Sequence, residues 1–149
     1  MAERIQELFA VEAPEPDWSD RAAMIEYLVE AERPFAGTSR PFHADGVRAV
    51  AALAVDRTAN VAAQVTNPFL LDAGEPWRAR LGEIRVPTLV VHGREDPMFP
   101  FGHAEAMVRE SPGSRLLAMA HTGHEVFPRS TWDEVVSAIV ELGEPGASR

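Results

Sequence analysis

Hydrophobic residues recur at helical spacing in the first half of the chain. Ile25, Leu28 and Val29 predict an amphipathic helix over residues 18–32, with Asp17 or Ser19 as its N-cap and Pro34 after its end. The i, i+3, i+4, i+7, i+8 spacing predicts a second helix over residues 47–55. Its apolar face consists of Val47, Val50, Ala51, Ala54 and Val55. The first half is therefore expected to be helical.

The other segments before residue 81 carry shorter patterns. Residues 60–65 either extend the second helix or begin another, and residues 1–9 and 75–81 predict short helices, with Trp77 facing inward. Residues 67–73 (NPFLLDA) are apolar, but Pro68 lies inside them and Gly74 follows, which predicts a packed connection. None of these segments predicts a strand.

The spacing of the hydrophobic residues changes after residue 81. Residues 86–92 (VPTLVVH) form a continuous apolar run that is typical of a strand buried on both faces of a parallel sheet. A helix over residues 103–110, a strand over residues 114–120 and a last helix that ends at Gly143 follow. Ser130 to Asp133 predicts a capping box for this helix. Its apolar face is Trp132, Val135, Val136, Ile139 and Val140. Alternating strands and helices indicate parallel strands joined by right-handed crossovers.

Composition narrows the class of protein. A chain of 149 residues with 46% hydrophobic and 25% charged residues is long enough for one globular domain. No apolar run approaches the roughly 18 residues of a membrane span, and the first ten residues do not resemble a signal peptide, so we expect a cytoplasmic protein. A net charge of −9 argues against nucleic-acid or membrane binding, and the lack of cysteine excludes thiolate chemistry.

Two loops after the predicted strands carry chemically useful residues. The first is residues 92–100 (HGREDPMFP), and the second is residues 121–125 (HTGHE). In open α/β sheets, functional groups gather in the loops at the carboxyl ends of the strands. A histidine that acts as a general base needs a carboxylate on its other ring nitrogen, so Asp96 and His124 are candidate partners.

The string HG-x-x-DP-x-x-P, followed by a short strand and then by Gly-His, resembles the last two strands of the α/β-hydrolases. The resemblance covers residues 81–142 and implies that Asp96 is the acid and His124 the histidine of a catalytic triad. It implies an α/β class and an incomplete α/β-hydrolase fold. A helical cap (residues 1–80) precedes the last two parallel strands and the C-terminal helices (residues 81–142) and a flexible tail (residues 143–149).

Each loop residue also has a simpler interpretation. Asp96 before Pro97 is typical of a turn, and Gly123-His124 alone is a weak signal. His92 is expected to bond the loop backbone. Two loop glutamates, Glu95 and Glu125, are expected to be solvated or to orient the loops. His121-x-x-His124 lacks the helical H-E-x-x-H arrangement of zinc enzymes, and no phosphate-binding glycine motif occurs, so neither a metal nor another cofactor is expected.

The nucleophile of the family is missing. No G-x-S-x-G string occurs in the sequence, and every serine has a local explanation at a cap, a turn, a helix or the tail. We predict that four residues bind a hydrophobic substrate under the cap: Phe42, Phe69, Leu70 and Trp77. Each of them is an equally good core residue. The strings DWSD, ERPFAG and NPFLLDAGEPW resemble the cap of actinobacterial esterases, including anthracycline methylesterase-like proteins.

Two functional hypotheses follow. The first is a serine hydrolase of hydrophobic carboxylic esters, present as a chain that is truncated or started at the wrong codon and is inactive alone. The second is a non-catalytic module that binds a ligand or another chain. An α/β-hydrolase strand normally has neighbours on both sides, so an open edge beside residues 86–92 predicts a marginal fold that self-associates or pairs with a complementing chain.

Overall fold

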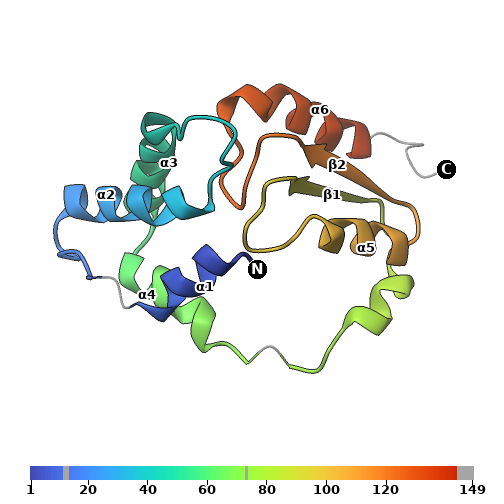
Figure 1. Cartoon of the computed structure of the whole chain (residues 1–149), viewed down its shortest axis with the longest axis horizontal. Coiled ribbons are helices and arrows are strands. Elements are labelled where there is room, and N and C mark those ends of the chain that lie inside the picture. The colour runs from blue at the N-terminus through green and yellow to red at the C-terminus, as the bar shows by residue number, and fades with distance from the viewer. Residues whose placement is uncertain (12–13, 73, 144–149) are drawn as a thin grey trace.

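The structure is a computed structural model that describes residues 1–11, 14–72 and 74–143. The side chain of Phe69 and residues 144–149, which make up most of the predicted tail, lie outside this description. The fold has a helical region and a small α/β region, arranged side by side (Figure 1). The order of helices and strands in the α/β region agrees with the sequence patterns.

Helices make up the first half of the chain. They are α1 (Glu3–Ala10), α2 (Arg21–Glu32), α3 (Ala44–Arg57) and α4 (Val61–Thr66), with 3-10 turns at Arg33–Phe35, Asn67–Leu70 and Arg78–Glu83. The carboxylate of Asp20 caps α2 by accepting from the amides of Ala22 and Ala23, so the prediction of Asp17 or Ser19 as N-cap was wrong. The side chain of Asn60 caps α4 as a separate helix.

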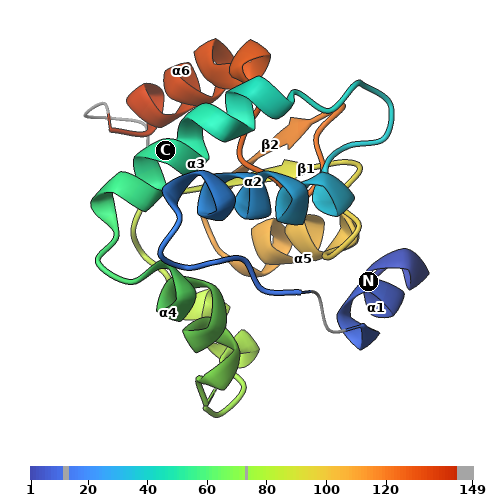
Figure 2. The ribbon, with the colours of Figure 1, turned by 90° about the vertical axis from the view of Figure 1, so that its left-hand side faces the viewer.

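The helical core lies between α2 and α3, which pack across each other (Figure 2). Its buried side chains are Ile25, Val29, Ala51, Val55 and Val61. The first four come from the predicted apolar faces of α2 and α3, and Val61 is the first residue of α4. Burial of aliphatic side chains such as Val and Ile stabilises a fold by roughly 1.5–3 kcal/mol each. Two ion pairs, Arg21–Asp56 and Arg48–Glu26, join the solvent-exposed rims of these helices.

The connection after α4 departs from the prediction. Leu70 and Leu71 are 79% and 76% exposed, and the other described side chains of residues 67–72 are exposed too, so they do not form the predicted packed connection. Trp77 is 57% exposed and precedes a 3-10 turn instead of facing inward from a helix. Pro68 lies at the start of the 3-10 turn Asn67–Leu70, which contacts the preceding helix α4. Hydrophobic residues alone did not specify burial.

The α/β region consists of β1 (Thr88–Gly93), α5 (Gly102–Glu110), β2 (Ser114–Met119), a 3-10 turn at Arg129–Thr131, and α6 (Trp132–Gly143). The strands are parallel, with Thr88 opposite Ser114 and Gly93 opposite Met119. Helices α5 and α6 lie on opposite sides of the sheet in both views (Figures 1 and 2). This is the predicted arrangement of two parallel strands with helices between and after them.

Fewer side chains are buried in this region than the sequence predicts. Thr88 to His92 are only half-buried, because β1 has a hydrogen-bonded neighbour on one side only among the described residues. In α6, Val135 is buried, whereas Val136, Ile139 and Val140 are more than half exposed. Ser130 lies inside the preceding 3-10 turn, so the predicted capping box does not form. No described helix is long and apolar enough to cross a membrane.

Candidate functional site

The site lies where the two parallel strands end. Residues 94–101 follow β1 and residues 120–128 follow β2, and the register of the strands brings both loops to the same edge. The loops are joined by backbone hydrogen bonds from Arg94 to Met119 (2.9 Å) and from Glu95 to Thr122 (3.0 Å). Side chains from both loops therefore face one another at fixed distances.

Glycine makes this close approach possible. A Cβ atom on Gly93 would lie 2.1 Å from the carbonyl oxygen of Thr122, and one on Gly123 would lie 2.0 Å from the carbonyl oxygen of Phe35. These are backbone atoms that cannot rotate away. The glycines of the two sequence motifs, HG and GH, are thus required by packing between three chain segments.

Asp96 and His124 meet at the centre of the site. The Asp96 Oδ2 atom lies 3.0 Å from the Nδ1 atom of His124, and the Asp96 side chain is only 3% exposed. The other carboxylate oxygen accepts from the amides of Met98 (2.8 Å) and Phe99 (2.7 Å). Because an ionised carboxylate can only accept, the imidazole proton on this side belongs to Nδ1. The same Asp96 carboxylate thus does both things that the sequence suggested: one oxygen forms the turn and the other pairs with His124.

The His124 ring is held but not enclosed. The phenyl rings of Phe99 and Phe35 pack edge-on against it, with centroids 5.3 Å and 6.2 Å away, and its side chain is 44% exposed. The backbone amide of His124 donates to the carbonyl oxygen of Phe35 at 2.8 Å. Within the described part of the chain, Nε2 has no polar partner. The nitrogen opposite Asp96 is therefore available to another group.

A cavity of about 330 Å³ opens beside this pair. Its lining residues are Glu32, Val91, His92, Gly93, Asp96, Phe99, Gly123, His124, Glu125, Val126 and Phe127. Burial raises the pKa of the Glu32 carboxyl, and the nearby Glu125 adds to this effect, while His124 opposes it. The cavity thus places His124, the candidate proton acceptor, beside apolar side chains.

Three of the predicted substrate-binding residues, Phe42, Leu70 and Trp77, are not among the residues that line this cavity. Phe42 packs against the α2–α3 core, with the guanidinium of Arg33 4.5 Å from its ring centroid. Leu70 and Trp77 are exposed, and the side chain of Phe69 is not described. The structure therefore brings Asp96 and His124 together but does not bring Phe42, Leu70 or Trp77 to them.

The remaining histidines of the two loops are His92, whose Nε2 atom also lies 3.5 Å from Oδ2 of Asp96, and His121. His92 Nε2 lies 2.9 Å from the carbonyl oxygen of Phe99, in agreement with the predicted bond to the loop backbone. His121 Nδ1 lies 2.8 Å from the hydroxyl of Ser39, which also donates to Glu95. Among the described residues, no group of three or more histidine and acidic side chains is arranged to hold a metal ion.

Two loop glutamates hold the same neighbouring segment. Glu95 accepts from Ser39 and from the amide of Thr38, and these hydrogen bonds lower the pKa of its carboxyl to about 2. Glu125 forms a buried ion pair with Arg40 at 2.5 Å. Sequence patterns assigned both glutamates only to solvation or loop orientation and missed Arg40 and Ser39, because both partners lie more than 50 residues away along the chain.

Serine hydroxyls do not approach His124 in the described part of the chain. The hydroxyl of Ser39 is the one that contacts a histidine, and that histidine is His121. His121 uses its Nδ1 atom for both Ser39 and Glu95, with the latter 3.6 Å away. A triad needs the acid and the serine on opposite ring nitrogens, so this cluster is not one.

Comparison with known proteins assigns the chain to a family and a fold. A profile of the alpha/beta hydrolase fold matches residues 3–130. The chain belongs to the alpha/beta hydrolase fold family. The AB hydrolase superfamily protein YisY of Bacillus subtilis is 42% identical over 53 residues, which are 36% of this chain and 20% of that protein. The pimeloyl-[acyl-carrier protein] methyl ester esterase of Nitrosomonas europaea is 36% identical over 70 residues, 43% of this chain and 28% of that protein.

A solved structure gives the same assignment of the fold. The esterase EaEST from Exiguobacterium antarcticum superimposes with a TM-score of 0.51 and 23% sequence identity, over 85% of this chain and 48% of that chain. The chain thus spans about half the length of this esterase and matches less than a third of either curated relative. Its two-stranded sheet is a fragmentary alpha/beta hydrolase fold with esterase-like relatives.

Proposed function

We propose that this chain supplies the acid and the histidine of a serine hydrolase that acts on a hydrophobic carboxylic ester. The observation that carries the proposal is the 3.0 Å contact between Asp96 and the Nδ1 atom of His124, which leaves Nε2 unpaired within the described residues. Asp96 orients the imidazole and stabilises its protonated form, as in other triads.

The proposed reaction is acyl transfer. His124 Nε2 takes the proton of a serine hydroxyl while its oxygen attacks the ester carbonyl, and the same proton then passes to the leaving alcohol. Water attacks the resulting acyl-enzyme, gives a proton to His124, and the serine recovers that proton when the carboxylic acid leaves. Neither half-reaction consumes a cofactor.

The nucleophile is not in these 149 residues, because they contain no G-x-S-x-G elbow. We therefore propose that the chain does not hydrolyse esters by itself. The hydroxyl of Ser39, engaged by His121 and Glu95, does not take the place of the missing serine.

The apolar walls of the cavity favour a hydrophobic ester. Val91, Phe99, Val126 and Phe127 line it beside His124. We propose that residues 1–80 act as a cap over the reacting carbonyl and residues 81–142 as part of the catalytic core. A pimeloyl-[acyl-carrier protein] methyl ester, as in the name of the Nitrosomonas relative, and anthracycline-type methyl esters are two substrates to be compared.

The test starts with the purified chain and a fluorophosphonate probe. We expect no labelled serine and no hydrolysis of p-nitrophenyl acetate or butyrate above the rate of a His124→Ala control. The coding DNA upstream of Met1 is then examined for an in-frame G-x-S-x-G. If a longer form that contains this motif is active, Asp96→Asn should lower its turnover by roughly four orders of magnitude. Full activity of Asp96→Asn in that form would contradict the proposal.

A second candidate is a non-catalytic interaction module. It is favoured by the open edge of β1 together with the exposed apolar face of α6 (Val136, Ile139 and Val140). In this case, a second copy or a complementing chain covers the sheet edge. The two candidates differ in the longer form: inactivity of a form that contains the elbow, with an intact Asp96–His124 contact, would favour the module.

A further inference from the structure

Glu125 is a buried carboxylate next to the histidine of the candidate pair. Its side chain is 4% exposed, and its Oε1 atom accepts from the amides of Gly37 and Gly123, both at 2.9 Å. Gly123 immediately precedes His124, and Gly37 belongs to residues 35–40, which come from the helical region. One carboxylate oxygen therefore joins the histidine loop to this distant segment.

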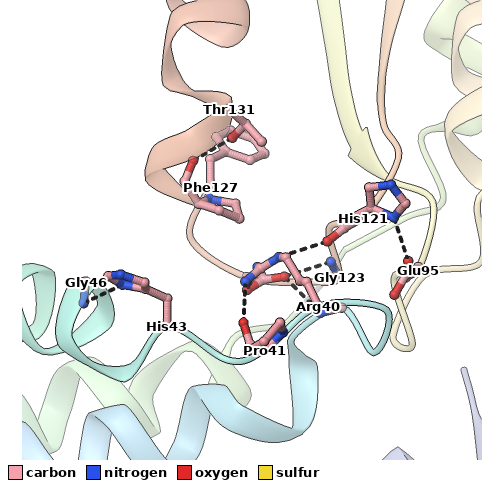
Figure 3. A network of polar contacts seen from close by, with 12 residues as sticks. Arg40, Pro41, His43, Gly46, Glu95, His121, Gly123, Phe127 and Thr131 are labelled. Atoms are coloured by element: carbon pink, nitrogen blue, oxygen red, sulfur yellow. Dashed lines mark hydrogen bonds and ion pairs between the residues drawn. The ribbon is translucent and has the colours of Figure 1, made fainter.

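Arg40 compensates the buried charge of Glu125. Its Nη2 atom lies 2.5 Å from Oε2 of Glu125, and its Nε atom donates to the carbonyl oxygen of His121 at 2.9 Å. Figure 3 shows the Arg40 side chain reaching toward the main chain around His121 and Gly123. Burying an unpaired carboxylate is costly, whereas three charge-assisted hydrogen bonds offset that cost. Arg40 thus attaches the same loop from a second direction.

Residues 35–40 also contact His124 itself and the residue next to Asp96. The carbonyl oxygen of Phe35 accepts from the amide of His124, and the Phe35 ring packs edge-on against the imidazole. On the other loop, Glu95 next to Asp96 accepts from the amide of Thr38 at 2.6 Å. The distance between Asp96 and His124 is therefore set partly by a segment that belongs to neither loop.

We propose that Glu125, paired with Arg40, is a positioning residue that holds His124 in contact with Asp96. The proposal rests on the proposed function for its catalytic meaning, since the position of His124 affects turnover only if His124 is the general base. Glu125 acts through Gly123 and Gly37, by keeping the backbone on both sides of His124 in place.

The test measures the ring of His124 directly. Long-range ¹H–¹⁵N spectra of the full chain at mildly alkaline pH report which nitrogen of a neutral imidazole carries the proton. In the unmodified protein we expect the Nδ1–H form, because Asp96 accepts from Nδ1. Asp96→Asn provides the reference spectrum for a lost contact.

Three variants separate positioning from general stability. Glu125→Ala removes the whole contact, Glu125→Gln keeps an oxygen for the two amides but loses the charge, and Arg40→Met removes the cation at similar length. Glu83→Gln is the matched control, because Glu83 forms an exposed pair with Arg80 at 3.1 Å. We expect Glu125→Ala and Arg40→Met to shift the ring to a mixture of both tautomers, Glu125→Gln to retain more of the Nδ1–H form, and Glu83→Gln to leave the spectrum unchanged.

Each result decides a different point. If Glu125→Ala and Arg40→Met keep the Nδ1–H form, Glu125 does not position His124 and the inference is overturned. If Glu125→Ala does not fold, Arg40→Met decides in its place, and an unchanged Nδ1–H form in Arg40→Met overturns the inference. If the unmodified protein already gives the spectrum of Asp96→Asn, the Asp96–His124 pair itself is absent, and the proposed function fails instead of the positioning role.

Discussion

Gly123 is the most severe steric constraint of the site, and Gly123→Ala tests it. An added Cβ atom would lie 2.0 Å from the Phe35 carbonyl oxygen and 2.7 Å from the Gly37 nitrogen, where ordinary contact begins at 3.4 Å. Both are backbone atoms, so the two segments must separate by about 1 Å or more. No positive φ is involved at Gly123, so the effect is one of space alone.

The cost follows from the hydrogen bonds that such a separation breaks. The bond from the His124 amide to Phe35 (2.8 Å) and the bond from Gly37 to Glu125 (2.9 Å) lie near the ideal length, and neither survives a displacement of that size. A neutral bond contributes about 1 kcal/mol and a bond to a charged group about 2 kcal/mol. We therefore expect Gly123→Ala to lower the free energy of unfolding by about 3 kcal/mol.

Urea unfolding followed by tryptophan fluorescence measures this loss, and amide hydrogen exchange localises it. The His124 amide should lose its protection in Gly123→Ala. Gly82→Ala is the matched control, because a Cβ atom there meets nothing within 4 Å. It should change the free energy of unfolding by less than about 0.5 kcal/mol. If both variants unfold alike and the His124 amide stays protected, the close approach of residues 35–37 and 123–124 is wrong.

Three further predictions concern pH, packing and association. The pKa of Glu95 is lowered from 4.5 to about 2 by the hydrogen bonds from Ser39, so its contribution to stability is complete above 4.5 and is lost as pH falls through about 2. Urea midpoints at neutral and acidic pH should therefore differ less in Glu95→Gln than in the unmodified protein; equal differences would contradict this. Val29→Ala should cost about 2 kcal/mol in urea unfolding because Val29 is fully buried, whereas Leu70→Ala, at a site 79% exposed, should cost less than about 0.5 kcal/mol. The chain should associate with increasing concentration in sedimentation velocity, and Val136→Glu on the exposed face of α6 should weaken this; a cooperative monomer at all concentrations would refute the prediction.

The local elements followed from the sequence because they depend on local physics. The apolar spacing of Ile25, Val29, Ala51 and Val55 predicts two amphipathic helices with apolar faces to bury, and in the structure these faces share one core. The β-branched residues Val90 and Val91, bounded by Pro87 and Gly93, likewise specify a strand and its loop. The order of these elements and the HG and GH motifs were enough to place Asp96 and His124 at the same sheet edge.

Tertiary structure decided the contacts that join distant parts of the chain. Arg40 and Glu125 are 85 residues apart, and no periodicity connects them; only folding brings the segment around Gly37 beside Gly123. Exposure of Trp77 and Leu70 was equally unpredictable, because burial requires a neighbouring surface and hydrophobicity alone does not supply one. The sequence by itself determined the helices, the parallel strands and the identity of the candidate pair. The tertiary structure decided the distance between Asp96 and His124 and the buried charges that hold it, because these depend on where three separate segments meet.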